Sequence, residues 1–139
     1  MYRPDHVVDL RVYDLRPGDD VNKEYRNIRA DIMNIRILES LHQSALVAAA
    51  NAETDFRTKH GEPMYCGFAW VHVSEKASTK LGRALMKLGF SKAYGGGLRL
   101  WNPGGSHTQS MDIKETGAAA YAKVLQDAGI NAYMESRAD

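Results

Sequence analysis

Residues 21–60 contain no proline or glycine, the residues that most often end a helix. Apolar side chains recur along it at intervals of three and four positions, as on one face of a helix. They are Tyr25, Ile28, Ile32, Ile35, Leu38, Leu41, Ala45, Ala48, Ala52 and Phe56. Gly61 and Pro63 follow and suit a helix C-terminus. The sequence therefore predicts one long helix over residues 19–61.

This helix is long for the size of the chain. With 139 residues and 15.5 kDa, residues 1–139 correspond to a single domain. A compact domain of that length is ~37 Å across, whereas a helix of about 36 residues extends ~54 Å. Either the helix breaks, or its far end packs on another copy of the chain. The alanine-rich segment 44–53 favours the second option, a homo-oligomer, because small side chains let helices approach closely.

The rest of the chain alternates strand and helix patterns. Residues 1–18 predict an N-terminal strand and a turn, and residues 66–135 predict an α+β core. In this core, strands are predicted at 66–73, 90–94, 98–101, 109–113 and 130–134, and helices at 78–89, capped by Ser78, and at 114–129. The predicted fold class is α+β, a long N-terminal helix followed by a βαββαβ, ferredoxin-like sheet-and-helix layer.

The first strand of this layer carries apolar side chains on both faces. Phe68 and Trp70 share one face, and Ala69, Val71 and Val73 share the other. Such a strand is typical of a sheet that is buried on both sides. We expect the two later helices to cover one face and the long N-terminal helix to cover part of the other.

Composition predicts a soluble protein of the cytoplasm. No window approaches the ~20 apolar residues of a membrane span, so no membrane partner is expected, and the N-terminus lacks a signal-peptide core. The single cysteine, Cys66, excludes an internal disulfide framework and fits a reducing compartment. Basic and acidic residues number 18 and 17, so any binding of a polyanion must be local.

Known catalytic signatures are missing from the sequence. There is no P-loop, no dinucleotide-binding glycine motif, no H-E-x-x-H and no G-x-S-x-G. The five histidines show no metal-ligand spacing, so we expect neither a metal site nor a cofactor. The adjacent Ser106 and His107 fit a solvated turn better than a catalytic triad. The sequence favours a non-enzymatic binding protein over an enzyme.

Basic residues offer one candidate surface. Lys76, Lys80, Arg83 and Lys87 follow spacings of four, three and four, which places them on one helix face. That face is either an ordinary solvated surface or a surface that meets phosphates. Arg137 near the C-terminus is expected in a frayed end, with a sheet edge or a subunit contact as alternatives.

A glycine-rich segment offers the other candidate. The triplet Gly95, Gly96 and Gly97 indicates either a tight connection at positive φ or a close approach of the backbone to another group. Further along, Pro103 and Gly104 suit the central positions of a type II turn.

Between the two glycine clusters, Arg99 and Trp101 alternate with two leucines and therefore share one strand face. They form a platform for a ring and a phosphate, or else a hairpin rim with Trp101 tucked under the long helix. In the first case Trp101 stacks on the ring, and Arg99 binds phosphates with help from neighbouring basic residues. The predicted ligand-binding residues are Lys80, Arg83, Gly95, Gly96, Gly97, Arg99, Trp101, Asn102 and His107.

The strings GFAWV, TKLGRAL, AYGGG, LWNPGG and SRAD resemble a group of small uncharacterised proteins of tailed bacteriophages. The resemblance covers roughly the last half of the chain and transfers no catalytic residue. It implies a phage accessory protein in the cytoplasm of the bacterial host, where such proteins often neutralise a host component. The expected function is binding of a nucleotide-like small ligand, such as a host immune signal. Docking on a host macromolecule is an alternative.

CGFAWVHV is also similar to the signature of RNA-recognition domains, K/R-G-F/Y-G/A-F-V-x-F/Y. Gly67, Phe68 and Trp70 occupy matching places. Cys66 replaces the basic residue of the signature, and Val73 replaces its last aromatic residue. The similarity makes single-stranded nucleic acid the second expected ligand.

Overall fold

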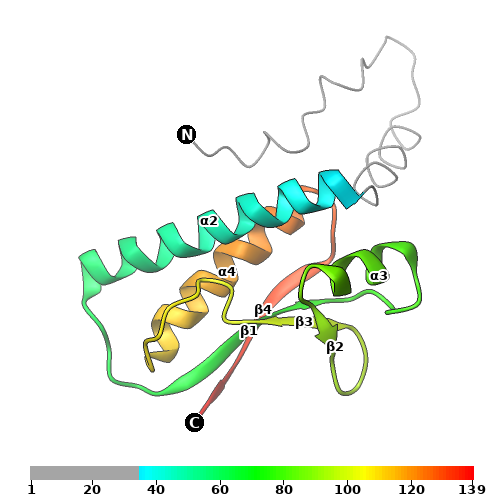
Figure 1. Ribbon diagram of the computed structural model, residues 1–139. Helices are drawn as coiled ribbons and strands as arrows, with labels where there is room; N and C mark the ends of the chain where they lie inside the picture. Colours follow the sequence, from blue (N-terminus) through cyan, green and yellow to red (C-terminus); the bar gives the residue numbers. More distant parts are fainter. Residues whose placement is uncertain (1–34) are drawn as a thin grey trace, which may run out of the picture.

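The computed structural model describes residues 35–139, which fold into three helices and a four-stranded sheet (Figure 1). The elements are α2 (Ile35–His60), β1 (Gly67–Val73), α3 (Lys80–Lys87), β2 (Ser91–Lys92), β3 (Leu98–Trp101), α4 (Met111–Asp127) and β4 (Ala132–Ala138). The α+β class is confirmed. The strand predicted within residues 1–18 and the helix predicted before Ile35 lie outside the described residues.

The sheet is antiparallel throughout, with the strand order β2-β3-β1-β4. Strand β1 lies in the middle and pairs with β3 on one side and with β4 on the other. In β1, Ala69, Val71 and Val73 are buried in the core, whereas Phe68 lies on the opposite face with 36% of its surface exposed. The division of the two faces was predicted correctly, but the expectation that both are buried is wrong.

The helices lie on one side of the sheet. Helix α4 packs on β1 and β4, and α2 packs on the outside of α4 (Figure 1). Helix α3 contributes Leu81 and Leu85 to the same core. The prediction that the long helix covers part of the second face is therefore wrong for its described part, residues 35–60, since a helix cannot contact α4 from there. Among residues 35–139, no helix covers that second face.

The alanine content of α2 has a structural reason within the chain. The buried residues of α2 are Leu38, Leu41, Ala45, Ala49 and Glu53. After Ala45 they differ from the predicted apolar stripe, which continues through Ala48 and Ala52. Helix spacing of four is kept from residue 41 to residue 53. Small side chains at these positions allow α2 and α4 to pack closely. Self-association stays a prediction.

Several element boundaries differ from those predicted. Thr79, not Ser78, caps α3, because its hydroxyl accepts a hydrogen bond from the backbone N–H of Gly82 at 2.9 Å. Residues 109–113 form no strand: Ser110 makes an isolated bridge to Cys66, and α4 begins at Met111. The predicted strand at 90–94 is reduced to Ser91–Lys92. No helix in the described part has the length and apolar character needed to cross a membrane.

Candidate functional site

Strand pairing gathers a set of large side chains on the uncovered face of the sheet. Trp70 on β1 lies between Trp101 on β3 and Glu135 on β4. One pair further along β1, His72 lies between Arg99 and Tyr133. Directly paired residues of an antiparallel sheet share a face. We call this surface the open face; it consists of Phe68, Trp70, His72, Arg99, Trp101, Tyr133, Glu135 and Arg137.

Aromatic rings on the open face form a contiguous cluster. The ring centroids of Trp70 and Trp101 are 4.9 Å apart, and Phe68 meets Trp101 edge-on at 6.1 Å. The Arg99 guanidinium lies 5.0 Å from the Trp101 ring centroid and 5.9 Å from that of Trp70. Trp101 is 44% exposed, and α2, the described part of the long helix, packs on α4 on the other side of the sheet and does not cover it. Exposed rings of this kind are available for stacking.

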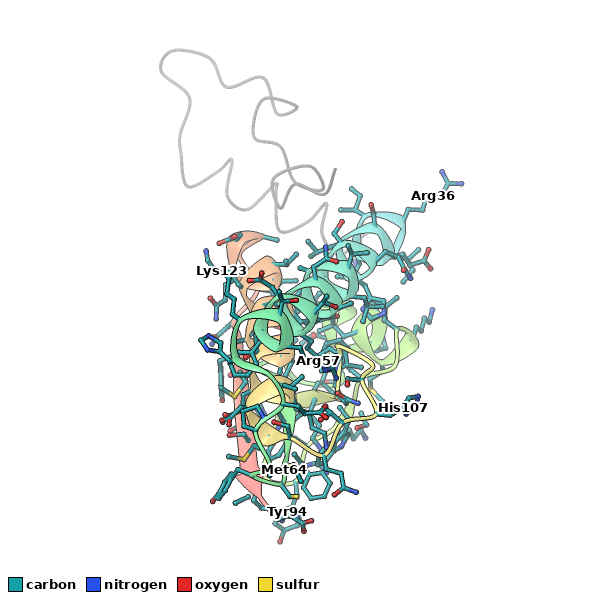
Figure 2. All side chains as sticks on the ribbon, turned by 90° about the vertical axis from the view of Figure 1, so that its left-hand side faces the viewer. Arg36, Arg57, Met64, Tyr94, His107 and Lys123 are labelled. Atoms are coloured by element: carbon teal, nitrogen blue, oxygen red, sulfur yellow. The ribbon has the colours of Figure 1, made fainter. Side chains whose placement is uncertain are left out.

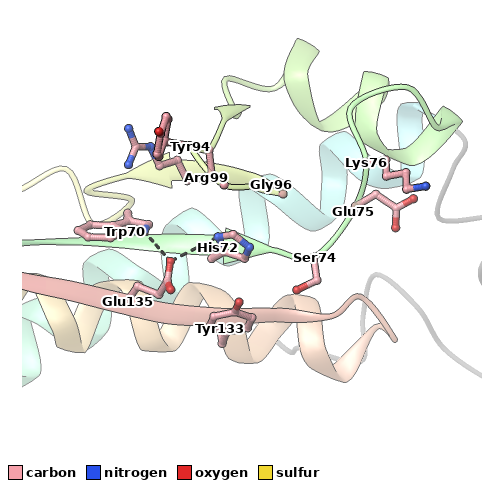
Figure 3. A pocket seen from close by; sticks show the side chains of 13 residues that line it. Trp70, His72, Ser74, Glu75, Lys76, Tyr94, Gly96, Arg99, Tyr133 and Glu135 are labelled. Carbon is pink, nitrogen blue, oxygen red and sulfur yellow. Dashed lines mark hydrogen bonds and ion pairs between the residues drawn. The ribbon is translucent and has the colours of Figure 1, made fainter.

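Glu135 ties two β1 side chains together at the centre of this face (Figure 3). Trp70 donates its indole N–H to Glu135 Oε1 at 2.9 Å. Nδ1 of His72 lies 3.3 Å from the same oxygen, close enough for an ion pair when the imidazole is protonated, but outside hydrogen-bond geometry. The His72 ring also stacks on Tyr133, with centroids 5.0 Å apart and planes at 30°.

A pocket of about 650 Å³ opens at one end of the open face (Figure 3). Its floor comes from His72, Arg99 and Tyr133, and one wall comes from the hairpin between β2 and β3. This hairpin contains the glycine triplet, and Tyr94 at its tip points away from the molecule (Figure 2).

The glycine triplet owes its composition mainly to backbone geometry. Gly95, Gly96 and Gly97 adopt φ values of 91°, 114° and 80°, a region that side chains disfavour. The turn is closed by a 2.9 Å hydrogen bond from Ala93 N–H to the Gly97 carbonyl. At Gly97, a Cβ atom would also overlap His72. Of the two predicted reasons, positive φ holds for all three glycines, and close approach applies to Gly97.

The structure brings together only part of the predicted ligand-binding set. The glycine triplet and Arg99 line the pocket, and Trp101 shares the face with Arg99 as predicted. Lys80 and Arg83 lie exposed on α3 and do not line the pocket. Arg83 instead donates a 2.9 Å hydrogen bond to the carbonyl of Ser78. Lys76, the first residue of the predicted basic stripe, lies before the helix, because α3 begins at Lys80.

Asn102 and His107 belong to a separate loop. Asn102 donates its side-chain amide to the Ser106 carbonyl at 2.8 Å, so its side chain serves the loop itself. A 3.0 Å bond from Gly105 N–H to the Asn102 carbonyl closes the predicted turn. Because the φ of Gly104 is not positive, this turn is not of type II. His107 is exposed and projects from the side of the molecule (Figure 2).

A buried carboxylate explains the glycine in that turn. Glu53 on α2 is 1% exposed, and neither carboxylate oxygen has a hydrogen-bond partner among residues 35–139. A Cβ atom at Gly104 or at Gly117 would overlap its side chain. Burial raises the pKa of Glu53, and the charges of Arg57 and Lys114 oppose this shift.

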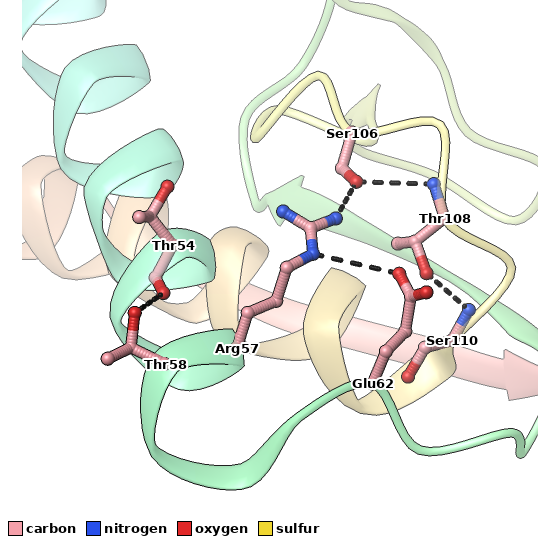
Figure 4. A network of polar contacts seen from close by, with 7 residues as sticks. All are labelled: Thr54, Arg57, Thr58, Glu62, Ser106, Thr108 and Ser110. Atoms are coloured by element: carbon pink, nitrogen blue, oxygen red, sulfur yellow. Dashed lines mark hydrogen bonds and ion pairs between the residues drawn. The ribbon is translucent and has the colours of Figure 1, made fainter.

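Polar contacts beside Glu53 hold the same loop against α2 (Figure 4). Arg57 donates to the Ser106 hydroxyl and lies 3.6 Å from a carboxylate oxygen of Glu62. The hydroxyl of Ser106 also accepts the Thr108 N–H at 3.2 Å, and that of Thr108 accepts the Ser110 N–H at 3.0 Å. The loop that follows Trp101 is therefore fixed to the helical layer.

Sequence reasoning missed several residues of the open face, among them His72, Tyr133 and Glu135. For His72, the available signal was the alternation in β1, where small aliphatic residues occupy one face and ring-bearing residues the other. Arg137, expected in a frayed end, lies within β4 and pairs with Phe68. Within residues 35–139, no group of three or more His, Cys, Asp or Glu side chains is arranged to hold a metal ion.

The chain matches no protein-family model, no curated protein and no solved structure. The site must therefore be interpreted from its own geometry.

Proposed function

We propose that this protein binds single-stranded nucleic acid on the open face of its sheet. The observation that carries the proposal is the row of exposed aromatic side chains on adjacent strands, with Arg99 stacked among them. Every base offers a flat face to such a platform, and stacking on it tolerates any sequence. Arginine and aromatic rings together suit a ligand that carries both bases and phosphates.

The length of the platform favours a strand over a single nucleotide. Phe68 and His72 are four residues apart on β1, which corresponds to about 13 Å along the strand. Nucleotides of one strand repeat at about 3.4 Å in a duplex, so a platform of this length accommodates more than one base. A mononucleotide would leave much of the ring cluster unused.

The architecture supports the same proposal. Six elements after α2 follow the order βαββαβ, and the strand order β2-β3-β1-β4 fits a ferredoxin-like layer. RNA-recognition domains bind bases on aromatic side chains of a four-stranded sheet. The residues that match their signature here, Phe68 and Trp70, lie on the open face.

Arg99 is suited to contact the phosphates. Its guanidinium stacks on two tryptophan rings, and the residue lines the pocket. A guanidinium fixed by stacking loses little conformational entropy when it binds a phosphate. Charge-assisted hydrogen bonds to phosphate oxygens are stronger than neutral ones.

The pocket beside the glycine triplet favours a second candidate function. Its volume of about 650 Å³ and its lining of Arg99, His72 and Tyr133 suit one phosphate-bearing nucleotide. Under this alternative, the protein is a non-enzymatic binder of a nucleotide-like small molecule. For a phage protein, which the sequence resemblance implies, such binding would remove a host immune signal.

The two candidates differ in how binding depends on length and salt. We would measure fluorescence anisotropy with labelled oligonucleotides from a dinucleotide to a hexadecamer, and thermal shifts with mononucleotides and cyclic nucleotides. The strand proposal predicts affinity that rises with length up to the site size. With two or three phosphate contacts, the slope of log K against log salt should be about −1.4 to −2.1.

Saturable mononucleotide binding without length dependence would support the second candidate instead. If no nucleotide or oligonucleotide binds, both proposals are wrong. Val47→Ala provides a control, because Val47 is exposed on α2, which α4 separates from the sheet. This variant should bind as the unchanged protein does.

A further inference from the structure

Among the eight residues that define the open face, Glu135 is the only carboxylate, and Glu75 lines the pocket at the end of this face. A negative charge at this position repels the phosphates of a nucleic acid, so it weakens binding unless it contacts another part of the ligand. Its contact with Trp70 does not require a charge, because the amide oxygen of a glutamine accepts an indole N–H equally well. Its contact with His72 uses the charge only when the imidazole is protonated, and otherwise the charge is available to a ligand.

The second oxygen of Glu135 is available to a ligand. Trp70 and His72 both approach Oε1, whereas Oε2 has no hydrogen-bond partner among residues 35–139. The side chain is 41% exposed. In Figure 3 it lies beside the rings of Trp70 and His72, with Tyr133 on the same strand. A base that stacks on these rings would bring its edge toward this carboxylate. An ionised carboxylate only accepts hydrogen bonds, so it selects groups that donate them.

Among the bases, guanine has the edge that fits this acceptor best. Its Watson–Crick edge presents two adjacent donors, N1–H and the N2 amino group. Adenine, cytosine and uracil each present a single donor group beside one or more acceptors, which a carboxylate repels. Oε2 has two lone pairs and is able to accept from both donors of guanine.

We infer that Glu135 makes the open face selective for guanine within a single strand. This inference rests on the proposed function and names the base that the site prefers. Two hydrogen bonds to the edge of one base correspond to about tenfold or more in affinity. Stacking on the rings supplies base-independent affinity, and Glu135 supplies the discrimination.

The test uses labelled RNA pentanucleotides U-U-X-U-U, in which X is guanine, inosine, adenine, cytosine or uracil, and measures anisotropy with the full chain. Guanine is expected to bind about tenfold more tightly than adenine. Inosine keeps N1–H but lacks the amino group, so its affinity should fall between those of guanine and adenine. This series tests the inference without any variant.

Glu135→Gln then isolates the charge. The variant keeps an acceptor for Trp70, should retain binding to the all-uracil strand, and should lose the preference for guanine. Glu39→Gln, exposed on α2, is the matched control and should keep the preference. A melting temperature close to that of the unchanged protein verifies that each variant is folded.

The outcomes distinguish a wrong role for Glu135 from a wrong proposed function. Equal binding of all pentanucleotides, or a guanine preference that survives in Glu135→Gln, overturns the role of Glu135 and leaves the proposed function intact. Absence of binding to every pentanucleotide and to the longer strands overturns the proposed function.

Discussion

Replacement of Glu53 by methionine should stabilise the protein at neutral pH. The carboxylate is 1% exposed and lacks a hydrogen-bond partner within the described part of the chain. An unsatisfied buried polar group costs about 1–3 kcal/mol, and more when it is charged. Attraction from Arg57 and Lys114 offsets part of this cost. We therefore expect Glu53→Met, which keeps a similar volume, to raise the free energy of unfolding by about 1 kcal/mol, or about 4 °C in Tm.

The pH dependence of this gain tests its cause. Burial raises the pKa of Glu53 in the folded state above the ordinary value of 4.5. The folded state then keeps a proton that the unfolded state has already lost, so this group lowers stability as pH rises through the interval between the two pKa values. The advantage of Glu53→Met should be small at about pH 4.5, grow as pH rises through that interval, and stay constant above it.

Urea unfolding followed by circular dichroism between about pH 4.5 and pH 7.5 measures the effect. Glu39→Gln, at an exposed position of α2, serves as the control and should change stability little at any pH. If Glu53→Met lowers stability at neutral pH without pH dependence, the attraction of Arg57 and Lys114 outweighs the burial, and the reasoning is refuted.

Three further variants probe the fold and the site. Gly117→Ala should lower the free energy of unfolding by about 1–3 kcal/mol, because its Cβ would overlap Glu53. Most of this destabilisation should disappear when Gly117→Ala is made in a Glu53→Ala protein. Equal destabilisation with and without Glu53→Ala would argue against the overlap. Trp101→Ala should weaken oligonucleotide binding by about 1–3 kcal/mol in anisotropy titrations while leaving the circular dichroism spectrum unchanged, because the ring is 44% exposed. If Arg99 contacts one phosphate, Arg99→Ala should reduce the magnitude of the slope of log K against log salt by about 0.7. Lys123→Ala, at an exposed position of α4, is the control. An unchanged slope in Arg99→Ala, or the same reduction in Lys123→Ala, would exclude that contact.

The sequence predicted local structure well where a segment carries its own periodicity and end signals. The helices α3 and α4 and the strand β3 were predicted close to their positions, and Gly89 and Gly129 follow the helices at positive φ. Residues 109–113 were misread as a strand because the first turn of α4 is too short to display helical spacing. The helix pattern before Ile35 lies outside the described residues.

The arrangement of these elements was harder to predict. Alternation along β1 separates its two faces but does not identify which face a helix covers. Large apolar rings were therefore assigned to a second core, although Phe68 and Trp101 remain exposed. The platform also needs residues from β4, such as Tyr133 and Glu135, and only the strand pairing places them beside β1.

Intrinsic tryptophan fluorescence tests the proposed binding surface most directly. The chain has two tryptophans, Trp70 and Trp101, and both lie on the open face. Bases that stack on them change their emission, so titration with an unlabelled oligonucleotide should give a saturable change that follows the anisotropy curve. The change should be much smaller in Trp101→Ala. Binding detected by anisotropy without any change in tryptophan emission would place the nucleic acid elsewhere on the protein and contradict the proposal.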